Sequence, residues 1–524
     1  MNGAESLLRT AANCGVDACF ANPGTTELHL VEALDRVPSI RPVLALFEGV
    51  CTGAADGYAR MTGGPALTVT HLGPGFANGL ANVHNARRAR TPMINLIGDH
   101  ATWHLAADAP LASDIETLAR PMSGWVRRTA SAGSLSQDML DAVDAAYGAT
   151  RGGGAATLII AQDHCWDEST MAATATATPA RQQRTPSQDQ VATATSAIRK
   201  AQLEGRKVFM VLGGSGLGAA SKRVAARLGS KAGLTVLTGA PNGRADRGGH
   251  VPAIAAIPYF PEQAQPLLAD AGLVVLAGAI DPVQFFGYPG GRSRVAPDGV
   301  PVVVLAQPGE DVLAGLGALA DELGVTMEAI GATDRGQGFD RPVAADGPLT
   351  LAGIGSMLWS RLPEGAIVVS EAISSSGQIE HEEWKAAPHT SLAGTTGGAI
   401  GGGLPLTVGA AVACPDRKVI DLQADGSAAY TVQSLWTMAR ESLDVVVVLL
   451  ANRRYNILDI ELKRSGMGAG LTGLTDLGRP DIGWAKIAEG FGVAGIVAHD
   501  SATFAKALER GLRESGPLLI EAVI

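Results

Sequence analysis

The chain has 524 residues, of which 46% are hydrophobic and only 4% aromatic, with 66 glycines and a net charge of −10. This length predicts two to four domains, and the composition predicts an α/β protein with many tight turns and a large core. The acidic balance excludes nucleic acid as an expected partner, because phosphate contacts need clustered Lys and Arg.

Short apolar runs alternate with helical patterns along three segments of the chain, as βαβ units require. In the first segment, strands are predicted at 18–21, 42–47, 65–72 and 92–98, and helices at 51–62 and 76–89. In the second segment, strands are predicted at 207–214, 234–239, 272–278 and 300–306. In the third segment, they are predicted at 366–371, 418–423, 444–452 and 516–524. Near-continuous Val, Ile and Leu runs are typical of parallel strands covered on both faces, so we expect three doubly wound α/β domains with parallel sheets.

Two polar, low-complexity stretches separate these segments. The first, 168–190, is rich in Ala, Thr, Pro and Gln, and the second, 332–348, in Gly, Pro and polar residues. Both are typical of linkers. They divide the chain into predicted domains at 1–167, 191–331 and 349–524.

The sequence predicts a cytoplasmic protein without a membrane segment. Its five cysteines are scattered and include no Cys-x-x-Cys pair, which favours a reducing compartment. The N-terminus has no basic stretch followed by an apolar one, as a secretion signal would. No uninterrupted apolar run reaches about 18 residues, the length that a membrane helix needs.

Two polar residues follow neighbouring apolar runs of the third segment. Asp425 comes after the strand 418–423, and Asn452 ends the strand 444–452. In open α/β sheets, ligands bind at the carboxyl ends of the strands, and helix starts favour phosphate oxygens. Carboxylate and amide oxygens are ligands for Mg²⁺ or Ca²⁺. Taken alone, however, Asp425 is more typical of a helix N-cap and Asn452 of a turn than of a metal site.

The spacing of this pair resembles a known cofactor signature. Twenty-five residues separate Gly426 from Asn452, and the sequence resembles the Gly-Asp-Gly…Asn motif of thiamine-diphosphate enzymes, with Ala424 in place of the first glycine. The resemblance implies that Asp425, Asn452 and the backbone carbonyl of Arg454 hold Mg²⁺. It also assigns cofactor binding to Gly426, Ser427 and Tyr455.

The stretch 43–60, "VLALFEGVCTGAADGYAR", resembles another segment of the same family. Glu48 ends an apolar run and precedes a helix of small residues. It could therefore simply be a carboxylate at a helix start, where the helix dipole stabilises negative charge. The resemblance implies instead that Glu48 serves the N1′ atom of the cofactor's aminopyrimidine and moves its proton.

Two further stretches of the first segment carry candidate residues. "FANPGTTELH" contains a Pro-Gly turn, and the resemblance places Pro23 beside the pyrimidine and Thr25 in the substrate pocket. His71 and Asn78 flank a predicted Gly-Pro-Gly turn at a strand end. A lone His is more often structural, but His71 matches an active-site histidine of benzoylformate decarboxylases, which implies proton transfer. Asn78 is a predicted cofactor contact.

The stretch 397–403, "GGAIGGG", places five glycines around one isoleucine. It reads either as a flexible loop or as a close approach of backbone to a cofactor. The resemblance makes Ile400 the apolar wedge between the two cofactor rings, with Gly398 beside it. The stretch 370–378 matches a loop that binds the diphosphate, so Ser374 and Ser375 are candidates.

Together these segments resemble the acetolactate synthase and benzoylformate decarboxylase family over the whole chain. The resemblance implies an enzyme that uses thiamine diphosphate and Mg²⁺ to cleave a 2-oxo acid and to join the product to an acceptor, as acetolactate synthases do. It also implies a homodimer or homotetramer with active sites between chains. A simple 2-oxo-acid decarboxylase of the benzoylformate decarboxylase type and a non-catalytic binding or regulatory relative are the alternatives.

Some stretches depart from the family pattern. The Arg-Phe-Asp-Asp-Arg run that accompanies FAD is replaced by "AGAIDPVQFFGYPG", so we expect no FAD. The loop 213–218 after a strand is nucleotide-like, but a plain helix start in a Rossmann-like domain explains it. Glu461 stands near a position that is aromatic in the relatives, and His100 and His104 are polar additions with no predicted role.

Overall fold

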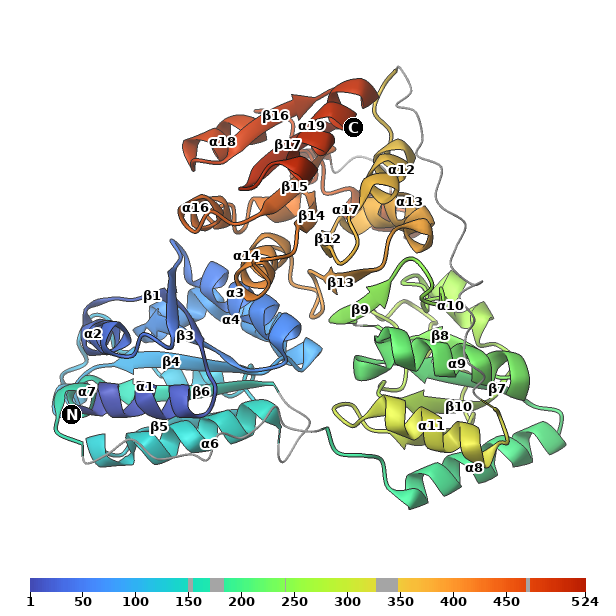
Figure 1. Cartoon of the computed structure of the whole chain (residues 1–524), viewed down its shortest axis with the longest axis horizontal. Helices are drawn as coiled ribbons and strands as arrows, with labels where there is room; N and C mark the ends of the chain where they lie inside the picture. Colours follow the sequence, from blue (N-terminus) through green and yellow to red (C-terminus); the bar gives the residue numbers. More distant parts are fainter. Residues whose placement is uncertain (149–153, 170–182, 241, 327–346, 468–471) are drawn as a thin grey trace. The chain divides into compact units, whose positions relative to one another are not determined.

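The computed structural model describes residues 1–148, 154–169, 183–240, 242–326, 347–467 and 472–524. The chain divides into two compact units (Figure 1). The first comprises 1–181, 340–383 and 392–524, and the second comprises 182–339 and 384–391. Most of both predicted linkers, 170–182 and 332–346, lies outside the described residues. The predicted domain boundaries therefore stay predictions.

The first sheet of the first unit has six parallel strands in the order β2-β1-β3-β4-β6-β5. The strands are β1 (Ala18–Asn22), β2 (Arg41–Leu44), β3 (Ala66–His71), β4 (Met93–Asp99), β5 (Trp125–Arg128) and β6 (Ala155–Ala161). The helices are α1 (Gly3–Asn13), α2 (Leu28–Arg36), α3 (Glu48–Thr62), α4 (Leu72–Ala89), α5 (Ile115–Ala119), α6 (Leu135–Tyr147) and α7 (Gln162–Trp166).

The second sheet of this unit includes the parallel run β16-β17-β15-β14-β12, with β13 next to β12. The strands are β12 (Ile367–Glu371), β13 (His389–Ala393), β14 (Val419–Ala424), β15 (Val445–Ala451), β16 (Ala494–Ala498) and β17 (Leu518–Val523). The helices are α12 (Leu351–Arg361), α13 (Ser376–Ile379), α14 (Gly403–Ala413), α15 (Asp425–Ala428), α16 (Ser434–Arg440), α17 (Asn456–Arg464), α18 (Trp484–Gly490) and α19 (Ser501–Arg513).

The second unit contains a parallel sheet in the order β11-β10-β7-β8. Its strands are β7 (Lys207–Leu212), β8 (Thr235–Thr238), β10 (Ala271–Ala277) and β11 (Val302–Ala306), and β9 (Arg244–Arg247) is a further strand of this unit. Its helices are α8 (Gln188–Leu203), α9 (Ala219–Ala232), α10 (Pro261–Leu267) and α11 (Val312–Glu322). The predicted α/β class with three parallel sheets is therefore confirmed.

The predicted Gly-Pro-Gly turn after His71 is wrong. Helix α4 already begins at Leu72, so Gly73, Pro74 and Gly75 form its first turn. Proline fits there because the first N–H groups of a helix have no partner within the helix. Helix α4 is thus longer than the predicted helix 76–89, and it carries Asn78, Asn82 and Asn85 on one rigid element.

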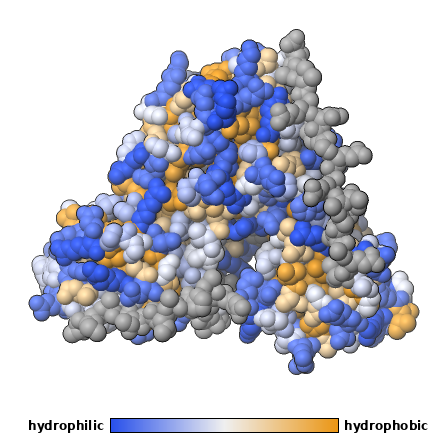
Figure 2. Space-filling view, in the orientation of Figure 1, coloured by the Kyte–Doolittle hydropathy of each residue, from blue (hydrophilic) through white to orange (hydrophobic). Residues whose placement is uncertain are grey.

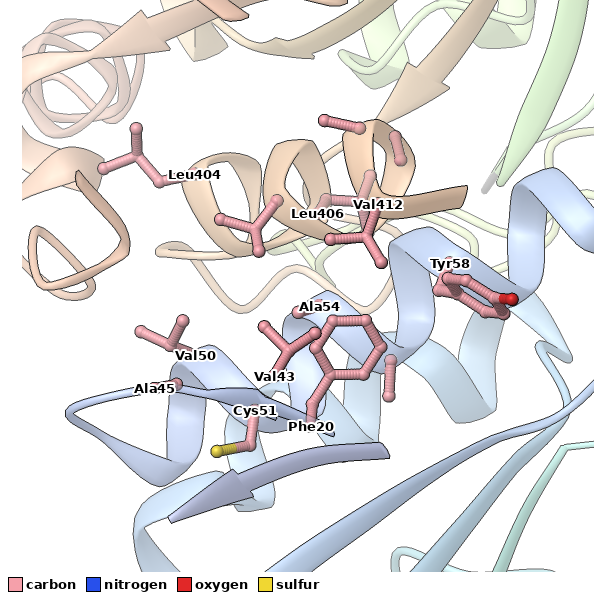
Figure 3. Close-up of a cluster of buried hydrophobic side chains, with 14 of the residues drawn as sticks. Phe20, Val43, Ala45, Val50, Cys51, Ala54, Tyr58, Leu404, Leu406 and Val412 are labelled. Carbon is pink, nitrogen blue, oxygen red and sulfur yellow. The ribbon is translucent and has the colours of Figure 1, made fainter. Parts of the chain in front are cut away.

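Helices α3 and α14 pack against each other and connect the two sheets of the first unit (Figure 1). Leu404, Leu406 and Val412 of α14 face Val50 and Ala54 of α3 in one apolar cluster (Figure 3). Glycine permits this close contact. A Cβ on Gly57 would lie 2.1 Å from the carbonyl oxygen of Leu406, and one on Gly409 would lie 1.8 Å from that of Ala54. The small residues of α3 are therefore a packing surface.

The face drawn in Figure 2 is mostly hydrophilic, with hydrophobic residues in small groups. Across the residues that the structure describes, no helix combines the length and the apolar character that crossing a membrane requires.

Candidate active site

Glu48 is the first residue of α3, which follows β2 in the first sheet. Its side chain is almost fully buried, and its Oε2 accepts a hydrogen bond from the Asn78 amide at 3.0 Å. A Cβ on Gly75 would lie 2.9 Å from Glu48 Oε1, so the first turn of α4 passes close to the carboxylate. The structure thus brings the predicted residues Glu48 and Asn78 together, although they come from different helices.

His71 ends β3 and pairs with a carboxylate that the sequence analysis missed. Its Nδ1 lies 2.8 Å from Oε2 of Glu27, whose side chain is fully buried, while the His71 side chain is 23% exposed. Glu27 Oε2 also accepts the Gly24 N–H at 2.8 Å, and the Thr26 hydroxyl lies 3.2 Å from His71 Nδ1. Because Nδ1 faces a carboxylate, it carries the ring proton that donates to Glu27.

The only sequence signal for Glu27 was its place in the quoted stretch "FANPGTTELH". Two glycines make room for the pair. A Cβ on Gly98 of β4 would lie 1.9 Å from Glu27 Oε1, and one on Gly24 would lie 2.2 Å from His71 Nδ1. Pro23 is half-buried and follows β1, whereas Thr25 is exposed in the short 3-10 helix Thr25–Glu27.

Asp425 and Asn452 lie at the same edge of the second sheet, because β14 and β15 are neighbouring parallel strands paired up to Ala424 and Leu450. The Asp425 carboxylate is buried, and this burial raises its pKa above the ordinary value. Asp425 Oδ2 accepts the Arg453 N–H at 2.6 Å and Oδ1 accepts the Gly426 N–H at 2.8 Å. The carboxylate therefore holds together the two loops that follow β14 and β15.

These residues fit a hard cation. Each oxygen of the Asp425 carboxylate keeps a second lone pair beside its backbone N–H bond. Asn452 Oδ1 accepts the Arg454 N–H at 2.9 Å, which orients that amide and the Arg454 peptide. Carboxylate, amide and carbonyl oxygens form the donor set that Mg²⁺ and Ca²⁺ take. Among the described residues, no cluster of three or more His, Cys, Asp and Glu offers a metal site of another kind.

Three more predicted cofactor residues surround Asp425. Ser427 is buried within α15. A Cβ on Gly426 would lie 2.5 Å from Cε1 of Tyr455, so this position needs glycine for the ring to lie where it does. Burial raises the pKa of Tyr455 above its ordinary value.

Ser374 and Ser375 end the 3-10 helix Ile373–Ser375, directly after β12. Ser374 Oγ accepts a hydrogen bond from the Asn456 amide at 3.2 Å, which joins this loop to the start of α17. Ser375 is buried. The loops after β12, β14 and β15 therefore gather at one edge of the sheet, as a phosphate-binding edge requires.

Gly398 and Ile400 lie in the loop between β13 and α14. Gly398 has a φ of 82°, which glycine adopts without cost, and Ile400 is half-buried. Glu371, the last residue of β12, accepts N–H groups from this loop. Glu371 lies in the stretch 370–378, in which only Ser374 and Ser375 were predicted as site residues.

The stretches that departed from the family pattern show local contacts of their own. The His100 and His104 rings lie 5.4 Å apart, and Glu461 pairs with Arg464 at 2.7 Å on α17. In the second unit, the Asp246 carboxylate accepts the Ala219 N–H at 3.0 Å, at the start of α9 after the glycine-rich loop. A carboxylate at that helix start occupies the place where a phosphate would bind.

Two family models match separate stretches of the chain. Residues 1–118 match the N-terminal TPP-binding domain of thiamine pyrophosphate enzymes, and residues 375–522 match the C-terminal TPP-binding domain. Both stretches carry the candidate residues described above.

Whole-chain relatives agree with these matches. The chain is 44% identical to the Mycobacterium tuberculosis protein IlvX, whose name assigns it provisionally as an acetolactate synthase large subunit, over 100% of this chain and 99% of that protein. It is 27% identical to benzoylformate decarboxylase of Pseudomonas aeruginosa over 97% of this chain and 96% of that enzyme.

Solved structures share the fold. The thiamine diphosphate-dependent 4-hydroxybenzoylformate decarboxylase of Rhodococcus jostii superposes with a TM-score of 0.84 at 23% identity, covering 100% of this chain and 99% of that chain. Benzoylformate decarboxylase of Polynucleobacter necessarius superposes with a TM-score of 0.80 at 19% identity, with the same coverage.

Proposed function

Because the chain belongs to the thiamine pyrophosphate-dependent enzymes related to acetolactate synthases and benzoylformate decarboxylases, we propose that it cleaves a 2-oxo acid between its carbonyl carbon and its carboxylate. When bound, thiamine diphosphate supplies the electron sink for this cleavage. The protein supplies orientation, proton transfer and the exclusion of water.

In this proposal Glu48 exchanges a proton with N1′ of the cofactor's pyrimidine. The support is a buried carboxylate whose Oε2 is held by Asn78, which leaves Oε1 to carry the proton. A carboxylate in a dry site that is fixed in one orientation is suited to general acid–base work.

His71 delivers a proton to the carbon that has lost CO₂. The observation that carries this step is the hydrogen bond between His71 Nδ1 and the buried Glu27 carboxylate. The carboxylate stabilises the ring when both nitrogens are protonated, so that Nε2–H serves as the acid. The products are then an aldehyde and CO₂, and the ring regains its proton from solvent. This geometry favours the simple decarboxylase among the predicted alternatives.

Carboligation is the second candidate, supported by the 44% identity to a protein named as an acetolactate synthase large subunit. In that reaction the carbon that has lost CO₂ adds to the carbonyl of a second molecule, which gives a hydroxyketone or a 2-hydroxy-2-alkyl-3-oxo acid. Protonation by His71 would compete with this addition.

Asp425, Asn452 and the carbonyl of Arg454 would hold Mg²⁺, and Ser374, Ser375, Gly426 and Ser427 would lie against the diphosphate. The support is the oxygen donor set at one strand edge and the small residues beside it.

We further propose that the active unit is a homodimer or a larger homo-oligomer. The cofactor must reach both Glu48 and Asp425, yet along α3 and α14 the two sheets of one chain meet through close-packed apolar side chains (Figure 3). A second copy of the chain would then supply the other half of each site.

The test is CO₂ release from a panel of aliphatic, branched and aryl 2-oxo acids, with the cofactor and Mg²⁺ present or omitted. Each reaction is run with and without an aldehyde or a second 2-oxo acid as acceptor, and products are identified by NMR. Aldehyde in all reactions supports the decarboxylase, and hydroxyketone or 2-hydroxy-2-alkyl-3-oxo acid supports the carboligase. No CO₂ from any of these substrates would contradict the proposal.

A further inference from the structure

The glycine-rich loop 397–403 is held firmly on both sides of Ile400. Before Ile400, the Ala399 carbonyl accepts a hydrogen bond from the Asn85 amide at 2.9 Å. After it, the Gly401 carbonyl accepts one from the Thr431 hydroxyl at 2.9 Å. The peptide groups that flank Ile400 therefore have fixed partners, and the reading of this stretch as a flexible loop does not apply to them.

One buried carboxylate gathers the N–H groups at the end of this loop. Glu371 Oε1 accepts from Gly401 N at 2.8 Å and from Gly402 N at 3.2 Å, while Oε2 accepts from Gly403 N at 2.8 Å. The Gln423 amide donates to Oε2 at 2.9 Å. The Glu371 side chain is only 1% exposed, so these four donors replace its hydration.

The glycines allow the backbone to approach this carboxylate. A Cβ on Gly403 would lie 2.8 Å from Glu371 Oε2 and 2.2 Å from Gln423 Oε1. A Cβ on Gly402 would lie 2.3 Å from the Gly394 carbonyl oxygen, and Gly401 has a φ of 89°. The last three glycines, 401–403, thus let the backbone donate its N–H groups to Glu371 without steric conflict.

The negative charge of the Glu371 carboxylate strengthens its hydrogen bonds to loop 397–403. Among the described residues, the groups that stabilise the Glu371 carboxylate are the Gln423 amide and the N–H groups of Gly401, Gly402 and Gly403, so backbone N–H groups at the start of α14 carry most of its stabilisation. Burial raises the pKa of Glu371, and the four N–H donors act in the opposite direction. A loop that moved away would leave a buried carboxylate without its donors, which is costly.

We propose that Glu371 is a positioning residue, whose carboxylate holds loop 397–403 so that Ile400 stands where the cofactor rings bind. The inference rests on the proposed function, because it takes thiamine diphosphate as the ligand that Ile400 contacts. Glu371 itself touches no reacting atom, and its effect on the reaction passes through the backbone on either side of Gly401.

The first test is hydrogen–deuterium exchange, followed by mass spectrometry, on the cofactor-free protein. Glu371→Gln presents an NH₂ group where a carboxylate oxygen accepted N–H groups, so peptides containing Gly401–Gly403 should exchange about 10- to 100-fold faster. Unchanged exchange would overturn the proposal.

The matched control is Glu521→Gln. Glu521 of β17 is also a buried carboxylate in the same sheet, and it accepts an N–H of a helix start, that of Ala485 in α18, at 2.8 Å. It does not contact the loop, so its variant should leave the exchange of 401–403 unchanged. If Glu371→Gln does not fold, Glu371→Asp keeps the charge, withdraws it by one methylene and should expose the same amides.

The second test asks whether Glu371 acts through Ile400. The exchange of the C2 proton of bound thiamine diphosphate is measured in Glu371→Gln, Ile400→Ala and the double variant, with cofactor binding checked by calorimetry. The double variant should be no slower than Ile400→Ala alone. Losses that multiply would show an independent role and overturn the proposal. A wild type that binds no thiamine diphosphate would overturn the proposed function, and the cofactor-free exchange would still decide whether Glu371 holds the loop.

Discussion

The buried Glu27 carboxylate lies 2.8 Å from Nδ1 of His71, and it receives the Gly24 N–H on the same oxygen. The two residues are 44 positions apart in the chain and meet because η1 (Thr25–Glu27) packs against the ends of β3 and β4. The pair fixes the orientation of the only histidine that the sequence analysis assigned to catalysis.

Glu27→Gln should lower kcat with little change in KM. The amide that the variant carries at this position cannot stabilise a doubly protonated His71 ring. The rate of proton delivery by His71 should therefore fall, and the loss should not exceed the usual contribution of a general acid, about 10²–10⁴-fold. Steady-state kinetics across pH on the best substrate of the panel measures this. Glu32→Gln on the exposed face of α2 is the control. A double variant with His71→Ala that is slower than His71→Ala alone would contradict a role through His71.

Glu48→Gln should fold and bind the cofactor but slow its activation. The proposed metal ligands are on the other sheet, so affinity should be close to that of the wild type, while exchange of the C2 proton should fall by about 10²–10⁴-fold. NMR after acid quench follows that exchange. Wild-type exchange in Glu48→Gln would leave Glu48 as a helix-start carboxylate alone.

Asp425→Ala should abolish Mg²⁺-dependent binding of thiamine diphosphate. The variant loses one of the few proposed oxygen ligands and the contact that joins the loops after β14 and β15. Titration calorimetry with Mg²⁺ present and with a chelator measures the effect. Unchanged affinity would remove Asp425 from the metal site. Glu514→Ala at the C-terminal end of α19, which loses exposed ion pairs with Arg510 and Arg513, is the control.

Mixing two inactive variants should restore activity if the sites lie between chains. A dimer that combines Glu48→Gln with Asp425→Ala has one site with both mutations and one site with neither. Random pairing makes half of the dimers mixed, so activity should recover to about one quarter of the wild-type value. Co-expression with two affinity tags isolates the mixed dimer. No recovery in that dimer would place both residues in one site of a single chain.

Asp421→Asn should stabilise the protein increasingly as pH rises. Asp421 of β14 is fully buried, and burial, together with the nearby Glu371 carboxylate, raises its pKa well above 3.8, whereas the Thr407 hydroxyl acts in the opposite direction. Above that value the unfolded chain loses a proton that the folded chain keeps, so wild-type stability falls with pH. The gap between variant and wild type should widen by up to about 1.4 kcal/mol per pH unit.

Thermal unfolding of wild type and Asp421→Asn between pH 5 and 8 checks this prediction. Glu509→Gln, which changes an exposed carboxylate of α19, should show a constant difference from the wild type. A pH-independent difference for Asp421→Asn would mean that Asp421 is ionised in the folded protein.

The sequence by itself determined the strands that carry the site and the residues at their ends. Buried parallel strands need near-continuous Val, Ile and Leu runs, so the polar residues that follow them stand out. Glu48, Asp425 and Asn452 were predicted in this way, and the spacing between Gly426 and Asn452 identified the cofactor class that the family models match.

Only the tertiary structure decided which further carboxylates contact the candidate site residues or loop 397–403, and what role the glycines of that loop have. Glu27 and Glu371 are two of 51 acidic residues, and their partners lie 44 and 30 positions away, beyond the reach of any local pattern. The glycines of loop 397–403 read equally as flexibility or as close contact until the carboxylate beside them was placed. The physical reason is that a buried carboxylate needs hydrogen-bond donors around it. Those donors come from distant parts of the chain, and only folding brings them together.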